Sequence, residues 1–223
     1  LDGSKGARAI VLTLSPPASV LIESAARPEE EIQMSEKAYG SWPSLIRADR
    51  LATAALRFSQ PCIDGEDVYW LEGRAAEGGR QAVMQAPLVA GGSTREFSPA
   101  SVNVRTRVHE YGGGDFAVHD GRLIFVDFSD QRIYLGGRPG EQPLSLAGPR
   151  YADFEVSGDG RWLFAVEECH REGREPENRL VAFELPPASQ PVVAQSPRVI
   201  ASGFDFYSFP VLSPAGDRLA FTA

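Results

Sequence analysis

Four short apolar runs, each following a glycine-containing turn, constrain the fold of this chain more than any other feature of its sequence. An Asp-Gly pair between apolar runs is a strong signal for a β-hairpin, because a tight turn of the primed type needs positive φ at both central positions. The successive intervals Gly65 to Gly121, Gly121 to Gly160 and Gly160 to Gly216 are 56, 39 and 56 residues long. The sequence therefore predicts a repeated β-hairpin. The turns and the runs after them are Asp64-Gly65 with Val68–Leu71, Asp120-Gly121 with Leu123–Val126, Asp159-Gly160 with Trp162–Ala165, and Ala215-Gly216 with Leu219–Phe221.

Further apolar segments flank each hairpin, so that each repeat can hold four strands. Four strands in about 40–50 residues are typical of one blade of a β-propeller. We therefore predict an all-β fold, a partial β-propeller of four-stranded antiparallel blades. Three blades are expected to be complete, and the chain then supplies the first two strands of a fourth. The predicted blades span residues 52–98, 111–147 and 151–202, and the outermost strand of the second blade is placed at Pro143–Leu146.

The chain divides into two parts by composition. Residues 1–38 contain Pro16-Pro17 and the acidic run Glu29–Glu31 but little periodicity, and we predict an N-terminal extension that is poorly ordered or partly helical. Residues 39–223 are predicted to form the incomplete propeller domain, truncated in its fourth blade, because a propeller usually needs 4–8 blades. The chain is therefore expected to be part of a longer polypeptide.

The charge balance argues against several classes of function. The 22 Lys and Arg residues and 30 Asp and Glu residues of the 223-residue chain give a net charge of −8. A protein that grips nucleic acid needs a positive stripe, so we expect no nucleic-acid partner. The run Ala9–Leu14 is too short for a membrane span or for a secretory signal. We therefore expect no membrane association and a cytoplasmic location.

Recognisable catalytic and metal-binding motifs are missing from the sequence. No serine lies in a Gly-x-Ser-x-Gly motif, so this chain is expected to contain no catalytic residue of its own. There is no Cys-x-x-Cys, His-x-x-x-His or calcium-type loop, and we expect neither a metal nor a cofactor. Cys62 and Cys169 cannot form a disulfide framework and are expected to be small, buried or half-buried thiols.

Two polar segments are candidates for a role in substrate access or at a domain interface. In the first, three glycines follow a polar run, and we weigh a purely structural bend against a cluster of Arg107, His109, Glu110 and Tyr111 that faces a central tunnel or a domain interface. In the second, Glu167 and Glu168 are interpreted as solvated loop acids. The alternative is that their loop reaches over one face of the propeller, towards a partner domain or the amine of a peptide.

An ordered set of motifs resembles the propeller of the prolyl oligopeptidase family, and in particular its dipeptidyl aminopeptidase and acylaminoacyl peptidase group. The resemblance extends over residues 39–223. It departs from the family pattern at Ala215, where such turns often carry Asp. The matching segments are Tyr39–Ser44, Tyr69–Arg74 with Glu77–Arg80, Asn103–Gly114, Phe128–Tyr134, Arg150–Phe154 and Asp205–Pro214.

The resemblance implies a role in peptide hydrolysis. In this family an N-terminal propeller caps a C-terminal α/β-hydrolase domain, whose Ser–Asp–His triad cleaves short peptides, and the propeller filters substrates by size. It thus implies a substrate-gating portion of a serine peptidase (an aminopeptidase or oligopeptidase), with the hydrolase domain and short peptides as partners. No residue of the triad can be assigned to this chain. The alternative functions are a non-enzymatic propeller that binds a protein and a metal-dependent lactonase-type propeller.

Overall fold

A computed structural model describes residues 38–41, 56–89, 91–136 and 142–223 of the chain. Apart from Ala38, the predicted extension 1–38 lies outside these residues. Within them the fold is all-β, with one short 3-10 helix, and no helix is long and apolar enough to cross a membrane. The elements are β1 (Leu56–Asp64), β2 (Asp67–Arg74), η1 (Ala75–Glu77), β3 (Arg80–Pro87), β4 (Arg95–Glu96), β5 (Phe116–His119), β6 (Arg122–Val126), β7 (Ile133–Leu135), β8 (Arg150–Val156), β9 (Trp162–Cys169), β10 (Glu177–Glu184), β11 (Arg198–Ser202), β12 (Ser208–Leu212) and β13 (Leu219–Thr222).

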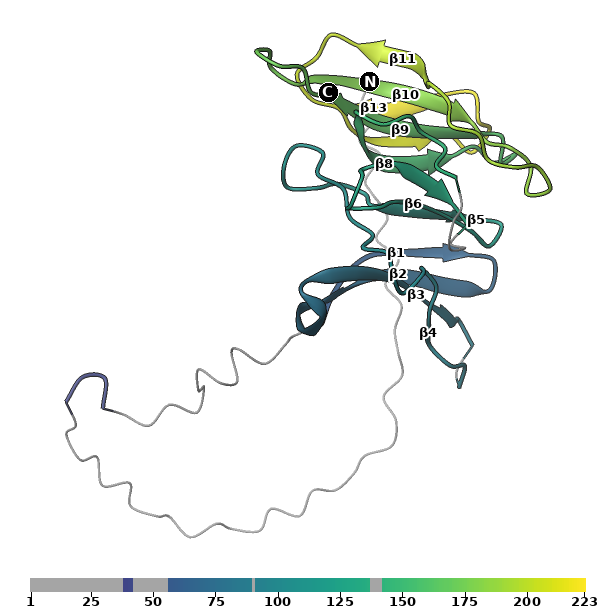
Figure 1. Ribbon diagram of the computed structural model, residues 1–223. Coiled ribbons are helices and arrows are strands. Elements are labelled where there is room, and N and C mark those ends of the chain that lie inside the picture. Colours follow the sequence, from purple (N-terminus) through teal and green to yellow (C-terminus); the bar gives the residue numbers. More distant parts are fainter. Residues whose placement is uncertain (1–37, 42–55, 90, 137–141) are drawn as a thin grey trace, which may run out of the picture. The chain divides into compact units, whose positions relative to one another are not determined.

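The strands form four antiparallel sheets that follow one another along the chain (Figure 1). Sheet 1 contains β1–β4, sheet 2 contains β5–β7, sheet 3 contains β8–β11 and sheet 4 contains β12 and β13. Within each sheet, neighbours in sequence are neighbours in space, so every connection is a simple hairpin or a loop along one edge. All four predicted hairpins are therefore confirmed.

Three of the four hairpin turns differ in detail from the prediction. Only the turn between β5 and β6 has positive φ at both central positions, Asp120 (49°) and Gly121 (70°). The turn after β1 is shifted by one residue, because Asp64 pairs with Asp67 and leaves Gly65 and Glu66 in the loop. The other two hairpins have longer loops, each beginning with a serine whose hydroxyl bonds an aspartate of the loop.

The predicted fourth strand of the second sheet is wrong. Residues 143–146 form no strand, although Leu144 donates its backbone N–H to the carbonyl of Ile133 in β7. The segment instead makes an isolated parallel bridge, Ser145 to Gln195, with the long connection between β10 and β11. Ile133 donates its N–H to the Ser145 hydroxyl rather than to a main-chain carbonyl, which interrupts the ladder.

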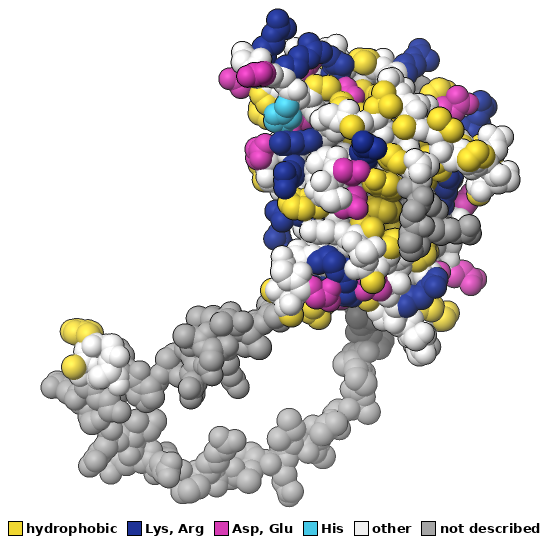
Figure 2. All heavy atoms as spheres, in the orientation of Figure 1, with side chains coloured by type: hydrophobic (Ala, Val, Ile, Leu, Met, Phe, Trp, Pro, Cys, Tyr) yellow, Lys and Arg dark blue, Asp and Glu magenta, His cyan; other side chains and the backbone are white. Residues whose placement is uncertain are grey.

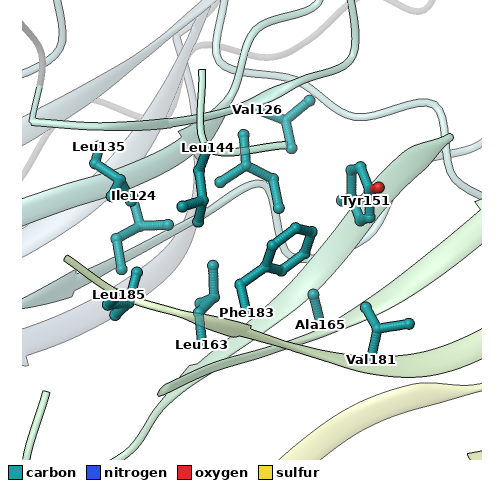
Figure 3. Packing of buried hydrophobic residues seen from close by; sticks show 11 residues of the cluster. Ile124, Val126, Leu135, Leu144, Tyr151, Leu163, Ala165, Val181, Phe183 and Leu185 are labelled. Atoms are coloured by element: carbon teal, nitrogen blue, oxygen red, sulfur yellow. The ribbon is translucent and has the colours of Figure 1, made fainter. Parts of the chain in front are cut away.

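Three apolar clusters hold the sheets together face to face. Leu123 and Phe125 of β6 pack towards sheet 1, whereas Ile124 and Val126 pack towards sheet 3. Side chains alternate between the two faces of a strand, so a strand in a sheet buried on both sides has a continuous apolar run. This explains the Leu-Ile-Phe-Val sequence of β6. Figure 3 shows the cluster between sheets 2 and 3: Ile124, Val126, Ile133, Leu135, Leu144, Tyr151, Leu163, Ala165, Val181, Phe183 and Leu185.

The first strands of successive sheets are also joined by hydrogen bonds from side chains. The Gln60 amide nitrogen donates to Asp115 Oδ2 (2.6 Å), which links sheet 1 to sheet 2. Asp153 of β8 accepts from the N–H of Gly114 on one side and from the N–H of Phe209 in β12 on the other. Gln60, Asp153 and Phe209 all have φ near 50–56° and lie at β-bulges, which turn these residues out of the regular ladder.

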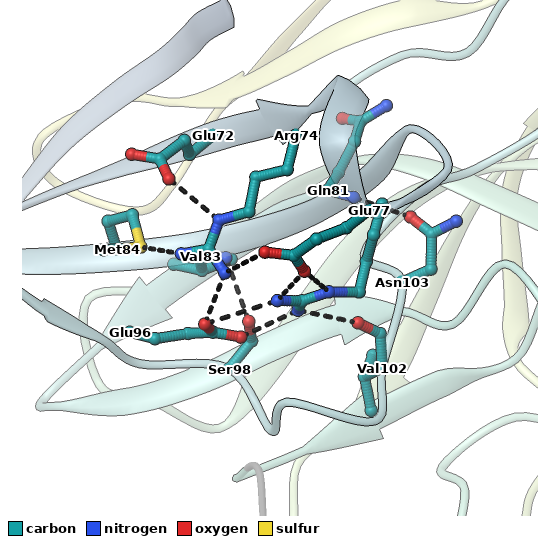
Figure 4. Close-up of polar contacts among 11 residues, drawn as sticks. Glu72, Arg74, Glu77, Gln81, Val83, Met84, Glu96, Ser98, Val102 and Asn103 are labelled. Atoms are coloured by element: carbon teal, nitrogen blue, oxygen red, sulfur yellow. Dashed lines mark hydrogen bonds and ion pairs between the residues drawn. The ribbon is translucent and has the colours of Figure 1, made fainter. Parts of the chain in front are cut away.

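An ion cluster fixes the outer end of sheet 1 (Figure 4). Glu96 of β4 accepts from Arg74 (2.7 Å) and Arg80 (2.7 Å), and these arginines also bond Glu72 and Glu77. Burial alone would raise the pKa of Glu96, but the hydrogen bonds and charges of Arg80 and Arg74 outweigh it and lower the pKa. The cluster therefore holds the two-residue strand β4 against the β2–β3 hairpin.

Candidate functional site

The polar segment 105–115 forms a tight turn between sheets 1 and 2. Its main chain has positive φ at His109 (55°), Glu110 (65°) and Gly112 (94°). Gly113 and Gly114 pack directly against sheet 3, where a Cβ on Gly113 would lie 2.9 Å from the Cβ of Ala152. The glycines permit this close approach, because a Cβ on Gly113 would force Ala152 or Asp153 to shift.

The carboxylate of Glu168 contacts several polar groups around this turn. It accepts from the N–H of His109 (2.7 Å) and contacts Nε2 of His170 (2.6 Å) and the guanidinium of Arg150 (3.3 Å). Arg150 in turn bonds the carboxylate of Glu110 and the carbonyl of Arg107. The structure thus brings four of the predicted residues together, Arg107 through its main chain. Arg150 and His170 belong to the cluster but were not among the predicted site residues.

Glu167 faces the opposite side of β9. It contacts the Tyr151 hydroxyl (3.2 Å) and the guanidinium of Arg179 (3.6 Å). The interpretation of Glu167 and Glu168 as solvated loop acids is wrong, since both lie within β9 with 4% and 3% of their surface exposed. Their burial is possible because each carboxylate has an arginine and a hydrogen-bond donor as partners.

Aromatic rings surround the exposed side of the turn. The His109 ring lies 5.7 Å from the ring of Tyr111 and 5.1 Å from that of Phe206, and its Nε2 is 3.1 Å from the Asn178 amide oxygen. Tyr111 itself is 81% exposed. The Arg107 guanidinium lies over the ring of Phe128 at 4.3 Å, an arrangement typical of a cation–π contact.

Glu110, Glu168 and His170 are close enough together to be considered as metal ligands. The positive charge between the two carboxylates is already supplied by the guanidinium of Arg150. Figure 2 shows that acidic and basic side chains are interspersed on the face it presents. We therefore interpret this group as an ion-pair cluster that joins the turn to sheet 3.

Two hollows lie along the first strands of the four sheets. The larger, of about 710 Å³, borders β1 and the 105–115 turn, and the smaller, of about 430 Å³, borders β1, β5, β8 and β12. Asp115 lines the larger hollow, and its carboxylate accepts from the N–H of Thr106 (2.6 Å) and from Gln60. Burial raises the pKa of Asp115 to about 6, against the opposing effect of these hydrogen bonds.

The raised pKa of Asp115 predicts that the contribution of this residue to stability falls as the pH rises from about 4 to about 6. In this range the folded chain keeps a proton that the unfolded chain has lost, so ionisation favours unfolding. The loss is at most ~1.4 kcal/mol per pH unit. Asp115→Asn should flatten this part of the profile, because asparagine stays neutral and can still accept from Thr106. Urea denaturation of both proteins at several pH values measures the difference, and parallel profiles would contradict it.

The two cysteines are free and half-buried, as predicted. Burial is the main reason that the pKa of each thiol rises to about 11, with Asp64 adding to the effect at Cys62 and Glu167 at Cys169. Since the thiolate is the reactive form, neither cysteine has the character of a nucleophile at neutral pH.

Neither a protein-family model nor a curated protein matches this chain. Among solved structures, it is similar to a puromycin-hydrolyzing peptidase of Mycobacterium tuberculosis, with 36% identity over 82% of this chain and a TM-score of 0.67. It is also similar to a puromycin hydrolase, with 28% identity over 84% of this chain and a TM-score of 0.68.

This chain spans about 30% of the length of the first structure and 31% of the second. The match confirms the resemblance to the prolyl oligopeptidase family. The chain is therefore related to the prolyl oligopeptidase family of peptidases, through a stretch that makes up about 30% of those proteins.

Proposed function

We propose that the chain forms a large part of a β-propeller that caps the α/β-hydrolase domain of a serine peptidase and admits only short peptides. The observation that carries this proposal is the match of 82% of the chain, at 36% identity, to a minor part of a puromycin-hydrolyzing peptidase. Because the matched relatives act on puromycin, we include small peptide-like amides among the proposed substrates.

The packing of the sheets supports the propeller part of the proposal. Sheets 2 and 3 each bury both faces against their neighbours, and all four first strands are joined side by side through Gln60, Gly114 and Asp153. In a propeller each blade packs against the next in this way, and its first strand lies nearest the axis. Further blades from the rest of the polypeptide would complete such a ring.

The first test concerns catalysis. We expect the 223-residue chain to show no labelling by a serine-reactive phosphonate probe, because it has no Gly-x-Ser-x-Gly motif. A known serine protease in the same reaction is the positive control. Mass spectrometry gives the labelled fraction, and stoichiometric labelling of this chain would overturn the assignment as a non-catalytic part.

The second test concerns access to the active site. The complete polypeptide that contains this chain should hydrolyse a short fluorogenic peptide but not the same sequence placed in a surface loop of a folded protein. A folded protein is wider than the gap a propeller offers, whereas an extended peptide can enter. Comparable hydrolysis of both substrates would contradict the gating role, and hydrolysis of neither would contradict the assignment to a peptidase.

A further inference from the structure

The larger hollow, of about 710 Å³, has the form of a ligand site. It lies between β1 and the end of the β2–β3 hairpin on one side and the 105–115 turn on the other. Arg57 and Arg105 line it together with the aromatic residues Tyr111 and Phe209. Small-molecule sites are typically concave, with apolar walls and a few polar groups that fix the orientation of the ligand.

The charge of the hollow differs in sign from that of the chain. Among the described residues, neither Arg57 nor Arg105 forms an ion pair, whereas Arg74, also in the lining, is bonded to Glu72 and Glu96. The acidic group of the lining is Asp115, which is buried. Arg57 and Arg105 therefore bring two positive charges to a shared cavity, where Asp115 acts electrostatically on Arg105, in a protein with a net charge of −8.

The walls of the hollow favour an extended, partly apolar ligand. The Arg105 guanidinium is held over the Phe128 ring at 5.2 Å, which limits the freedom it would lose on binding. Gly73 lies opposite Arg57 in the register of β1 and β2, so no side chain from β2 competes for the space there. Tyr111 and Phe209 are 81% and 71% exposed and offer ring surface to an apolar side chain.

We propose that this hollow binds short peptides through a carboxylate, held by Arg57 and Arg105, while an apolar side chain of the peptide packs on Tyr111 and Phe209. Arginine forms strong, charge-assisted hydrogen bonds with carboxylates. The carboxylate can be the C-terminus of the peptide or an acidic side chain, which share this chemistry. The inference rests on the proposed function insofar as it takes a short peptide as the ligand.

Calorimetric titration of the full 223-residue chain at about 50 mM salt tests the proposal. The probes are the tripeptide Ala-Ala-Phe as the free acid, the same tripeptide as the C-terminal amide, and Ala-Asp-Phe as the amide. We expect the free acid to bind about 10-fold more tightly than the plain amide, the difference that one charged hydrogen-bonding group provides. Tight binding of the Asp-containing amide would identify side-chain carboxylates as ligands too, and weak binding would restrict the site to the C-terminus.

Single substitutions test which residues cause the preference for the free acid over the amide. Arg57→Gln and Arg105→Gln should each reduce the preference for the free acid, and the double variant should abolish it. Arg198→Gln, a change of the same kind on the exposed strand β11 and outside the hollow, should leave the preference intact. Circular dichroism confirms that each variant is folded, and the single variants carry the test if the double variant does not fold.

Equal affinity of the free acid and the amide for the unchanged chain would overturn the inference. So would a loss of preference in Arg198→Gln as large as that in Arg57→Gln. These outcomes are independent of the phosphonate and access experiments, because binding is measured without hydrolysis. The binding experiment can therefore contradict the carboxylate site without contradicting the assignment to a peptidase. Equally, the phosphonate and access experiments can contradict the peptidase assignment without contradicting the carboxylate site.

Discussion

Replacing Phe183 by alanine is expected to lower the free energy of unfolding by about 3–5 kcal/mol. Phe183 is fully buried between sheets 2 and 3, and its ring packs edge-to-face on Tyr151 with 5.4 Å between ring centroids. Figure 3 shows it at the centre of the cluster, close to Leu163 and Ala165. Alanine would leave a cavity there, because the surrounding strands are held by their ladders and cannot collapse into the space.

Urea denaturation followed by circular dichroism measures this loss. Phe58→Ala is the matched control, since Phe58 lies in β1 with 63% of its surface exposed, and a surface change of this kind costs within about 0.5 kcal/mol. Similar losses for the two variants would mean that sheets 2 and 3 are not packed face to face in solution.

The second large effect is expected at Glu168. Glu168→Ala should lower the free energy of unfolding by about 1–3 kcal/mol, because it leaves the N–H of His109 without its acceptor and leaves Arg150 with Glu110 as its remaining carboxylate partner. Glu168→Gln should cost less, since the amide oxygen can still accept one of these bonds. The measurement is again urea denaturation.

Glu177→Ala provides the matched control for Glu168. Glu177 lies in the neighbouring strand β10 and pairs with Arg179 at the surface, with 44% of its side chain exposed. Its loss should change the stability by about 0.2–1 kcal/mol. If Glu168→Ala costs no more than Glu177→Ala, the cluster around Glu168 does not join the turn to sheet 3.

The repeat was predictable because its signals are local. The turn residues and the apolar runs after them specify each hairpin within about a dozen residues. The run of β6 also indicates burial on both faces, which the apolar clusters on its two sides confirm. The bulges at Gln60 and Asp153 left no such signal, because they depend on hydrogen bonds to a different sheet.

The candidate site was only partly predictable for the same reason. Four of its residues were proposed from two polar segments, but Glu168 meets His109 across 59 residues of sequence and Arg150 across 18. A Glu-Glu pair at the end of an apolar run reads as the beginning of a loop when those partners are unknown. Arg150 was quoted as part of a family motif, yet nothing nearby in the sequence indicates that it bridges two carboxylates.

The long connection between β10 and β11 affects which sheets unfold together. It reaches back to sheet 2, where Gln195 donates to the carbonyl of Leu144 and Pro186 accepts from Arg122. Hydrogen bonds thereby join sheets 2 and 3 at their outer margin, in addition to the apolar core that the two sheets share. Sheets 2 and 3 should therefore unfold as one cooperative unit. Among the described residues, no such connection from another sheet crosses the β12–β13 hairpin, so this hairpin can unfold separately.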